Sequence, residues 1–156
     1  MENHFNSNKF LFWQKWLFYS SLLFALFGIA FALSGILSLF MPYDKMIANA
    51  LWNRDGFSAD ADTFRAFIYI PFGGTMTCCY SLLAFIAWHP FKEKKAWARN
   101  AIIVSFSIWV IIDSLGCLYF KIYPQIYIIN AFSIIVKTLP IVFTWNDFSH
   151  SKNFTK

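Results

Sequence analysis

The feature that most limits how this chain can fold is a series of four long apolar segments. They cover residues 16–40, 66–88, 101–120 and 126–145. Each is close to the roughly 20 residues that a helix needs to cross the hydrocarbon layer of a membrane. Hydrophobic residues make up 58% of the 156 and charged residues only 13%, so a soluble domain of this size could not bury so much apolar surface. The sequence therefore predicts an all-α integral membrane protein, folded as a single four-helix bundle.

The basic residues indicate which way the bundle faces, because cytoplasmic loops of membrane proteins are enriched in Lys and Arg. One side would carry Lys9, Lys15, Lys92, Lys94, Lys95, Arg99, Lys152 and Lys156, and the other Lys45, Arg54, Arg65 and Lys121. We therefore expect both termini in the cytoplasm. Because the net charge of +5 is divided among short segments rather than gathered in one patch, we expect no nucleic-acid binding.

Two segments allow more detailed expectations. Ala30-Phe31-Ala32 has the form of a signal-peptide cleavage site, but the apolar run continues to Phe40, so we expect an uncleaved span. Residues 41–65 form the extracytoplasmic loop between the first two spans. Within that loop, residues 42–53 could form a short helix that lies at the membrane interface.

Small residues mark where the spans could approach one another, because helices in lipid associate through close packing. The first span carries them at alternating intervals of four and three: Ser21, Ala25, Gly28, Ala32 and Gly35. The second span carries a shorter series: Gly73, Thr77 and Ser81. The two series could face each other, or the first could form the contact of a homodimer or of another membrane-protein partner.

Two charged residues lie deep inside spans, Asp113 in the third and Lys137 in the fourth. Because a short loop makes these helices antiparallel neighbours, we expect the two charges to meet, with Asn130 and Ser133 alongside. Charges inside a membrane are costly and often functional. The functional interpretation is a proton or ion relay, or a pocket for a headgroup. The structural interpretation is a pair that fixes helix register, or a lysine that reaches the membrane surface.

Other site chemistry is scarce in the sequence. There is no phosphate-binding glycine loop, no nucleophile motif and no histidine pair with ligand spacing, so we expect no catalytic residues, metal site or cofactor. The turn that contains Lys92, Lys94 and Lys95 is basic and would lie against anionic lipid headgroups.

Parts of the second half of the chain resemble small uncharacterised four-span membrane proteins of bacteria. The resemblance lies in the segments Pro71-Phe72-Gly73-Gly74-Thr75-Met76, Trp88-His89-Pro90-Phe91-Lys92, Ala96-Trp97-Ala98 and Asp113-Ser114, and in Asn130. It implies a bacterial inner (cytoplasmic) membrane as the setting, and it carries no activity.

The leading functional hypothesis is a non-enzymatic accessory or interaction subunit that works through helix packing. The alternative is a small transporter or ion-coupled carrier that uses Asp113 and Lys137. An enzyme that acts on lipids ranks last, because no second acid–base group accompanies Asp113.

Overall fold

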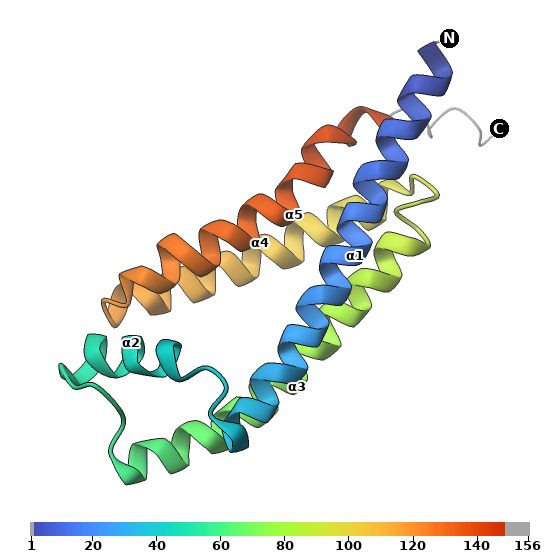
Figure 1. The fold of residues 1–156 in the computed structure, drawn as a ribbon. Helices are drawn as coiled ribbons and strands as arrows, with labels where there is room; N and C mark the ends of the chain where they lie inside the picture. The colour runs from blue at the N-terminus through green and yellow to red at the C-terminus, as the bar shows by residue number, and fades with distance from the viewer. Residues whose placement is uncertain (1, 149–156) are drawn as a thin grey trace.

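The structure, a computed structural model, describes residues 2–148, with side chains from residue 8 onward, and the described residues are helical apart from short connections (Figure 1). The helices are α1 (Glu2–Leu37), α2 (Met41–Trp52), α3 (Ala59–Trp88), α4 (Ala96–Tyr119), the π-helical segment η1 (Gln125–Asn130), α5 (Ala131–Phe143) and the 3-10 helix η2 (Trp145–Phe148). Among the described residues, four segments are long and apolar enough to span a membrane: Asn8–Leu37, Ala59–Trp88, Ala96–Tyr119 and Gln125–Phe143. The predicted all-α membrane fold is confirmed.

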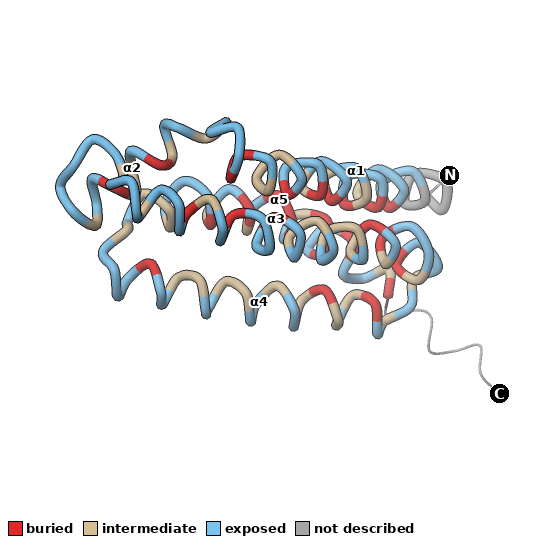
Figure 2. The backbone as a smooth tube through the Cα atoms, turned by 90° about the horizontal axis from the view of Figure 1, so that it is seen from below, coloured by how far each residue is buried: buried red, intermediate tan, exposed pale blue. Residues whose placement is uncertain are grey.

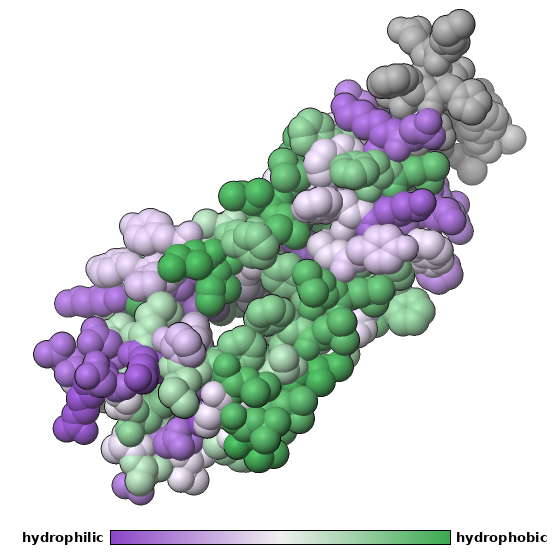
Figure 3. Space-filling model, viewed as in Figure 1, coloured by the Kyte–Doolittle hydropathy of each residue, from purple (hydrophilic) through white to green (hydrophobic). Residues whose placement is uncertain are grey.

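The surface has the polarity of a protein that is surrounded by lipid. Large apolar side chains such as Leu26 and Ile36 point outward, with 63% and 74% of their surface exposed. Hydrophilic residues gather near the two ends of the molecule, and a mostly hydrophobic band lies between them (Figure 3). This surface requires hydrocarbon around the middle of the bundle.

The helices divide into an α1–α3 pair and a second part formed by α4, η1 and α5, in which α4 packs mainly against η1 (Figure 1). α1 links the two, since the Gln14 side chain donates to the carbonyl of Ala87 in α3 at 3.0 Å, and the Trp16 indole donates to the carbonyl of Val136 in α5 at 3.2 Å. α4 runs apart from the other long helices for much of its length (Figure 2). It is accordingly the least covered span of the described chain.

Glycines bring the backbones of α1 and α3 unusually close. A Cβ atom added to Gly28 would lie 2.7 Å from the backbone nitrogen of Thr77, and one added to Gly73 would lie 2.8 Å from the Cα atom of Ala32. One added to Gly35 would lie 2.6 Å from the carbonyl oxygen of Ala66. The series of small residues on α1 therefore lies against α3, and Ser21 and Ala25 of the same series are buried as well.

α2 occupies the first loop, at the end of the bundle that we call the loop end. α1 stops at Leu37 because Ser38 adopts a left-handed conformation (φ 52°), and the Ser34 hydroxyl accepts a hydrogen bond from the Phe40 N–H at 3.1 Å. α2 ends in the same way at Asn53 (φ 52°), a residue type that tolerates this conformation. The chain then turns into α3.

An aromatic cluster closes the opposite end, which we call the terminal end. Phe10 of α1, Phe91 of the α3–α4 turn and Phe148 of η2 are buried and contact one another, with ring centroids 4.8–6.1 Å apart. The first and last described segments therefore meet at one end of the bundle, as a chain with an even number of spans requires.

Candidate functional site

Lys137 is fully buried, but it does not contact Asp113. Its Nζ atom donates to the hydroxyls of Ser20 and Ser21 in α1, each at 3.1 Å. The rings of Phe24 and Tyr80 lie beside it, with centroids 4.8 and 5.2 Å from Nζ. The Lys137 side chain therefore points from α5 toward α1 and α3, and its ammonium group contacts hydroxyls and aromatic rings of these two helices.

Asp113 has different neighbours. Its Oδ2 atom accepts a hydrogen bond from Asn130 Nδ2 at 2.6 Å and a weaker one from the Cys117 thiol at 3.6 Å. Asn130 Nδ2 also lies 3.3 Å from the hydroxyl of Ser114. Asn130 is therefore the contact that joins α4 to the fourth span at this level.

The expectation that Asp113 and Lys137 meet is corrected by these contacts. Asn130, the partner of Asp113, precedes Lys137 by seven residues, which is roughly 10 Å along a helix. Lys137 also reaches toward α1 rather than α4. Ser133 lies between the two levels and is buried. The predicted cluster is thus divided into an Asp113–Asn130 site and a Lys137 site.

The Asp113–Asn130 site has polar atoms left over. Asn130 is 1% exposed, and its Oδ1 atom is buried without a hydrogen-bond partner. The Oε1 atom of Gln125, at the start of η1, is also buried without a hydrogen-bond partner. Buried acceptors without a partner are costly, so these two oxygens lower the stability of η1.

α2 approaches the same site from the loop end. The pKa of Tyr43, in α2, is raised to about 12, mostly by burial and to a smaller extent by the charges of Asp113, Cys117 and Asp44. Asp113 thus has a smaller electrostatic effect on Tyr43 than burial does.

A second charged cluster, absent from the sequence analysis, joins α2 to the α1–α3 pair. Arg65 Nη1 lies 3.1 Å from Asp44 Oδ2 and donates to the carbonyl of Ser34 at 3.3 Å, and Arg65 Nε lies 2.8 Å from Asp62 Oδ1. The Tyr69 hydroxyl donates to Asp44 Oδ1 at 2.5 Å. Arg65, Asp44 and Tyr69 are all buried. We call these five residues the α2 latch.

A sequence signal for the α2 latch does exist. Asp44 follows the end of the first apolar run and Arg65 precedes the second, so the two opposite charges flank neighbouring ends of adjacent spans. The charge of Arg65 alone indicates only a position in the loop. Arg65 lies four residues before Tyr69, so both side chains share the helix face toward α1. This spacing is the sequence signal for the buried position of Arg65.

The basic turn offers fewer lysines to lipid than its sequence indicated. Lys92 and Lys95 are exposed, and Lys95 Nζ lies 3.9 Å from Glu93 Oε2. Lys94 Nζ is instead paired with Asp147 Oδ1 at 3.2 Å and lies 4.7 Å from the centroid of the Phe10 ring. Lys94 thereby fastens η2 to the turn. Anionic headgroup binding stays a prediction, now centred on Lys92 and Lys95.

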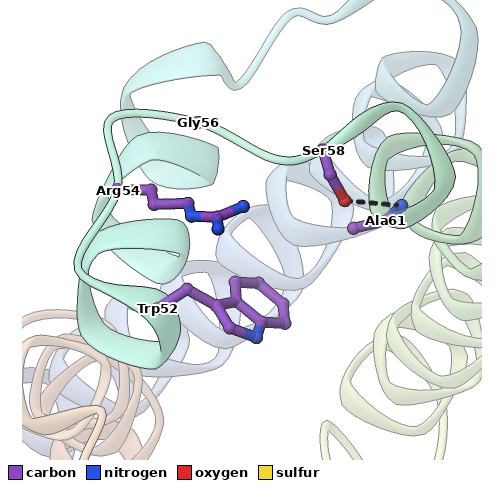
Figure 4. A pocket seen from close by; sticks show the side chains of 5 residues that line it. All are labelled: Trp52, Arg54, Gly56, Ser58 and Ala61. Carbon is purple, nitrogen blue, oxygen red and sulfur yellow. Dashed lines mark hydrogen bonds between the residues drawn. The ribbon is translucent and has the colours of Figure 1, made fainter.

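A pocket of about 130 Å³ lies in the loop that leads from α2 to α3. Its lining residues are Trp52, Arg54, Gly56, Ser58 and Ala61. The close-up shows the Arg54 side chain beside Trp52 and directed across the loop, and the Ser58 hydroxyl accepting from the Ala61 N–H (Figure 4). The hydrogen bond between Ser58 and Ala61 caps the start of α3. The pocket therefore follows from the way the loop enters this helix, and it is not evidence for a ligand.

Comparisons with known proteins identify no relative. No known protein family, no curated protein and no solved structure matches the chain. Of the predicted resemblance to bacterial four-span proteins, only the four apolar helices are supported. Within residues 8–148, no three His, Cys, Asp or Glu side chains are grouped so that they could hold a metal ion. Function must therefore be argued from the helices and their contacts.

Proposed function

We propose that this chain is a non-enzymatic accessory subunit that binds another membrane protein through the uncovered face of α4. The observation that carries the proposal is the low burial of α4 by its own chain. In its apolar window 11% of the residues are buried, against 17–33% in the other three spans. Since helices in lipid are held by packing contacts, α4 has the largest capacity for an additional partner.

The uncovered face has a spacing suited to helix packing. A stripe of large apolar residues follows it at alternating intervals of four and three, each residue more than half exposed: Val104, Ile108, Ile111, Leu115 and Leu118. We call this the α4 stripe. Residues with this spacing stay on one side of a helix and interlock with a neighbouring helix.

The carrier alternative receives less support from the contacts. It used Asp113 and Lys137 as one pair on a common path, whereas the two side chains have separate partners. Lys137 is also 0% exposed, so no route for a solute reaches its ammonium group in this conformation. A subunit that works through helix packing requires no change in the positions of Asp113 and Lys137.

The setting belongs to the same proposal: a bacterial inner membrane, with both termini in the cytoplasm. The distribution of Lys and Arg supports this orientation. The meeting of α1, the α3–α4 turn and η2 at the terminal end supports a common side for the two termini.

A photocrosslinking experiment tests the partner. A photoreactive residue replaces Ile111 in the α4 stripe and, as the matched control, Phe67, an exposed residue of α3. After irradiation of cells, we expect a discrete adduct from position 111 and none from position 67. The mass of the adduct distinguishes a second copy of the chain from a different protein. Only uncrosslinked monomer from both positions, at normal expression, would overturn the proposal.

A further inference from the structure

We propose that the terminal end of the bundle binds the headgroup of an anionic phospholipid, and that Arg99, at the start of α4, is the main contact. The first reason is the distribution of charge. Among residues 8–148, the loop end carries four aspartates and four basic residues. The terminal end carries two acids, Glu93 and Asp147, against six basic residues: Lys9, Lys15, Lys92, Lys94, Lys95 and Arg99. This excess of positive charge is complementary to an anionic headgroup.

The second reason is that Arg99 has no acidic partner in the described part of the chain. Both acids at the terminal end already contact lysines. Glu93 Oε2 lies 3.9 Å from Lys95 Nζ, and Asp147 Oδ1 lies 3.2 Å from Lys94 Nζ. The ion pairs within 4 Å do not include Arg99. Its charge is therefore available to an anion from outside the chain.

The guanidinium group of Arg99 is held in one orientation by its neighbours. Its Cζ atom lies 4.1 Å from the centroid of the Trp145 ring and 5.4 Å from that of Phe148. Nε and Nη2 donate to Asn100 Oδ1 at 3.2 and 3.0 Å, and Nη1 donates to the carbonyl of Trp145 at 3.5 Å. Because a guanidinium group has five N–H donors, one on Nη1 and one on Nη2 remain. Two such donors suit two oxygens of one phosphate.

A second cation and an apolar surface lie beside Arg99. Lys95 precedes it by four residues, so the two side chains are neighbours on one side of α4. Ile103, Phe106 and Val110 continue along that side at intervals of four, three and four, and each is only partly buried. The acyl chains of a lipid can therefore lie against α4 directly below the headgroup. This arrangement favours a phospholipid over a free phosphate ion, which would contact only the cations.

The depth of Arg99 in the membrane also fits a headgroup. The apolar span begins at Ala96, so Arg99 lies in its first turn. Trp97 and Trp145 are beside it and are 60% and 49% exposed. Exposed tryptophans near the end of a span mark the interface between hydrocarbon and water. Arg99 is thus placed at the level where the phosphates of the lipids lie.

Native mass spectrometry of the full-length protein in detergent tests the proposal. Phosphatidylglycerol, which carries one negative charge, and phosphatidylcholine, which is neutral overall, are titrated with identical acyl chains. We expect the dissociation constant of phosphatidylglycerol to be about tenfold lower. Equal dissociation constants would overturn the proposal. A separate titration adds inorganic phosphate. If phosphate at the same concentration displaces phosphatidylglycerol, the site binds anions without selecting a lipid, and the proposal is overturned as well.

Variants locate the effect. We expect Arg99→Gln to bring the dissociation constant of phosphatidylglycerol close to that of phosphatidylcholine. Arg99→Lys keeps the charge but removes the paired donors, so phosphatidylglycerol should bind roughly three- to fivefold more weakly. Arg54→Gln is the matched control, because it removes an exposed arginine at the loop end, and it should keep the full preference.

Circular dichroism checks that each variant is folded. If Arg99→Gln does not fold, Arg99→Lys and the wild-type titrations decide the matter. A preference for phosphatidylglycerol that persists in Arg99→Gln, is unchanged in Arg99→Lys, or is lost in Arg54→Gln would contradict the assigned site.

Discussion

At Lys137 a positive charge is buried without a carboxylate nearby. The hydroxyls of Ser20 and Ser21 donate to the carbonyl of Leu17, at 3.2 and 2.6 Å, so their lone pairs remain available to accept from Nζ. The faces of Phe24 and Tyr80 add electrostatic attraction, worth up to about 2 kcal/mol each in a desolvated setting. These contacts offset part of the cost of burying the ammonium group. Because all of these partners are neutral, removing the lysine leaves no unpaired opposite charge in the interior.

This arrangement predicts different outcomes for two substitutions of Lys137. Lys137→Met fills nearly the same volume and removes the buried charge, so we expect the free energy of unfolding to be unchanged or higher. Lys137→Ala leaves a cavity and should lower the free energy of unfolding by about 2–4 kcal/mol. Unfolding in detergent mixtures measures both. A loss in Lys137→Met as large as in Lys137→Ala would show that the polar contacts, rather than the packing, stabilise this position.

At the scale of elements, the α1–α3 contact depends on the absence of side chains at particular glycines. Gly73 faces the backbone of α1, whereas a Cβ atom on the adjacent Gly74 would meet nothing within 4 Å. The two neighbours differ only in the helix face that they occupy. They therefore form a natural pair for testing how closely the helices approach.

We expect Gly73→Ala to destabilise the protein and Gly74→Ala to leave it unchanged or slightly more stable. The added methyl group at position 73 forces the α1 and α3 backbones apart, at a cost of about 1–3 kcal/mol. At position 74 the methyl group has room, and alanine favours the helix by about 0.5–1 kcal/mol over glycine in soluble proteins. Thermal unfolding of the two variants side by side is the measurement. Equal effects would mean that α3 is rotated relative to α1.

The α2 latch makes a separate prediction about the first loop. Asp44→Asn keeps the shape of the side chain but leaves the buried Arg65 with only the half-exposed Asp62 as its acidic partner. We expect a loss of about 2–3 kcal/mol, less than for a fully stranded charge, and faster hydrogen exchange in α2. Asp55→Asn changes an exposed aspartate of the same loop and serves as the control. Unchanged exchange in Asp44→Asn would show that other contacts hold α2.

The elements differ in how far the sequence predicts them. The four spans follow from hydropathy alone, because lipid imposes the same requirement on every span. The small residues of α1 indicate which face packs but not against which helix, since α3 and a second copy satisfy the same rule. The Asp113–Lys137 pairing fails because helix rotation, altered here by the π-helical η1, decides whether a residue of α5 faces α4 or α1. Arg65 and Asp44 meet only through tertiary packing.

At the scale of the whole molecule, the described chain begins and ends at the same end of the bundle. Phe10, Phe91 and Phe148 hold α1, the α3–α4 turn and η2 together there, while α2 lies at the loop end (Figure 1). In the proposed topology, Arg54 and Asp55 face one side of the membrane, and Lys92 and Lys95 face the other. The positions of these segments support the proposed topology, and the basic residues predict which side is the cytoplasm.

Cysteine labelling in intact bacterial cells tests both parts of this topology. In a background where Cys78, Cys79 and Cys117 are alanine, single cysteines replace Asp55 and Lys95, both exposed loop residues. A membrane-impermeant maleimide should label Asp55→Cys in intact cells and Lys95→Cys only after permeabilisation, because Lys92, Lys94 and Arg99 remain around the second position and keep it on the cytoplasmic side. The reverse pattern would invert the orientation and leave the fold intact. Labelling of both positions from the same side would contradict the membrane crossing of α3, and with it the four-span architecture.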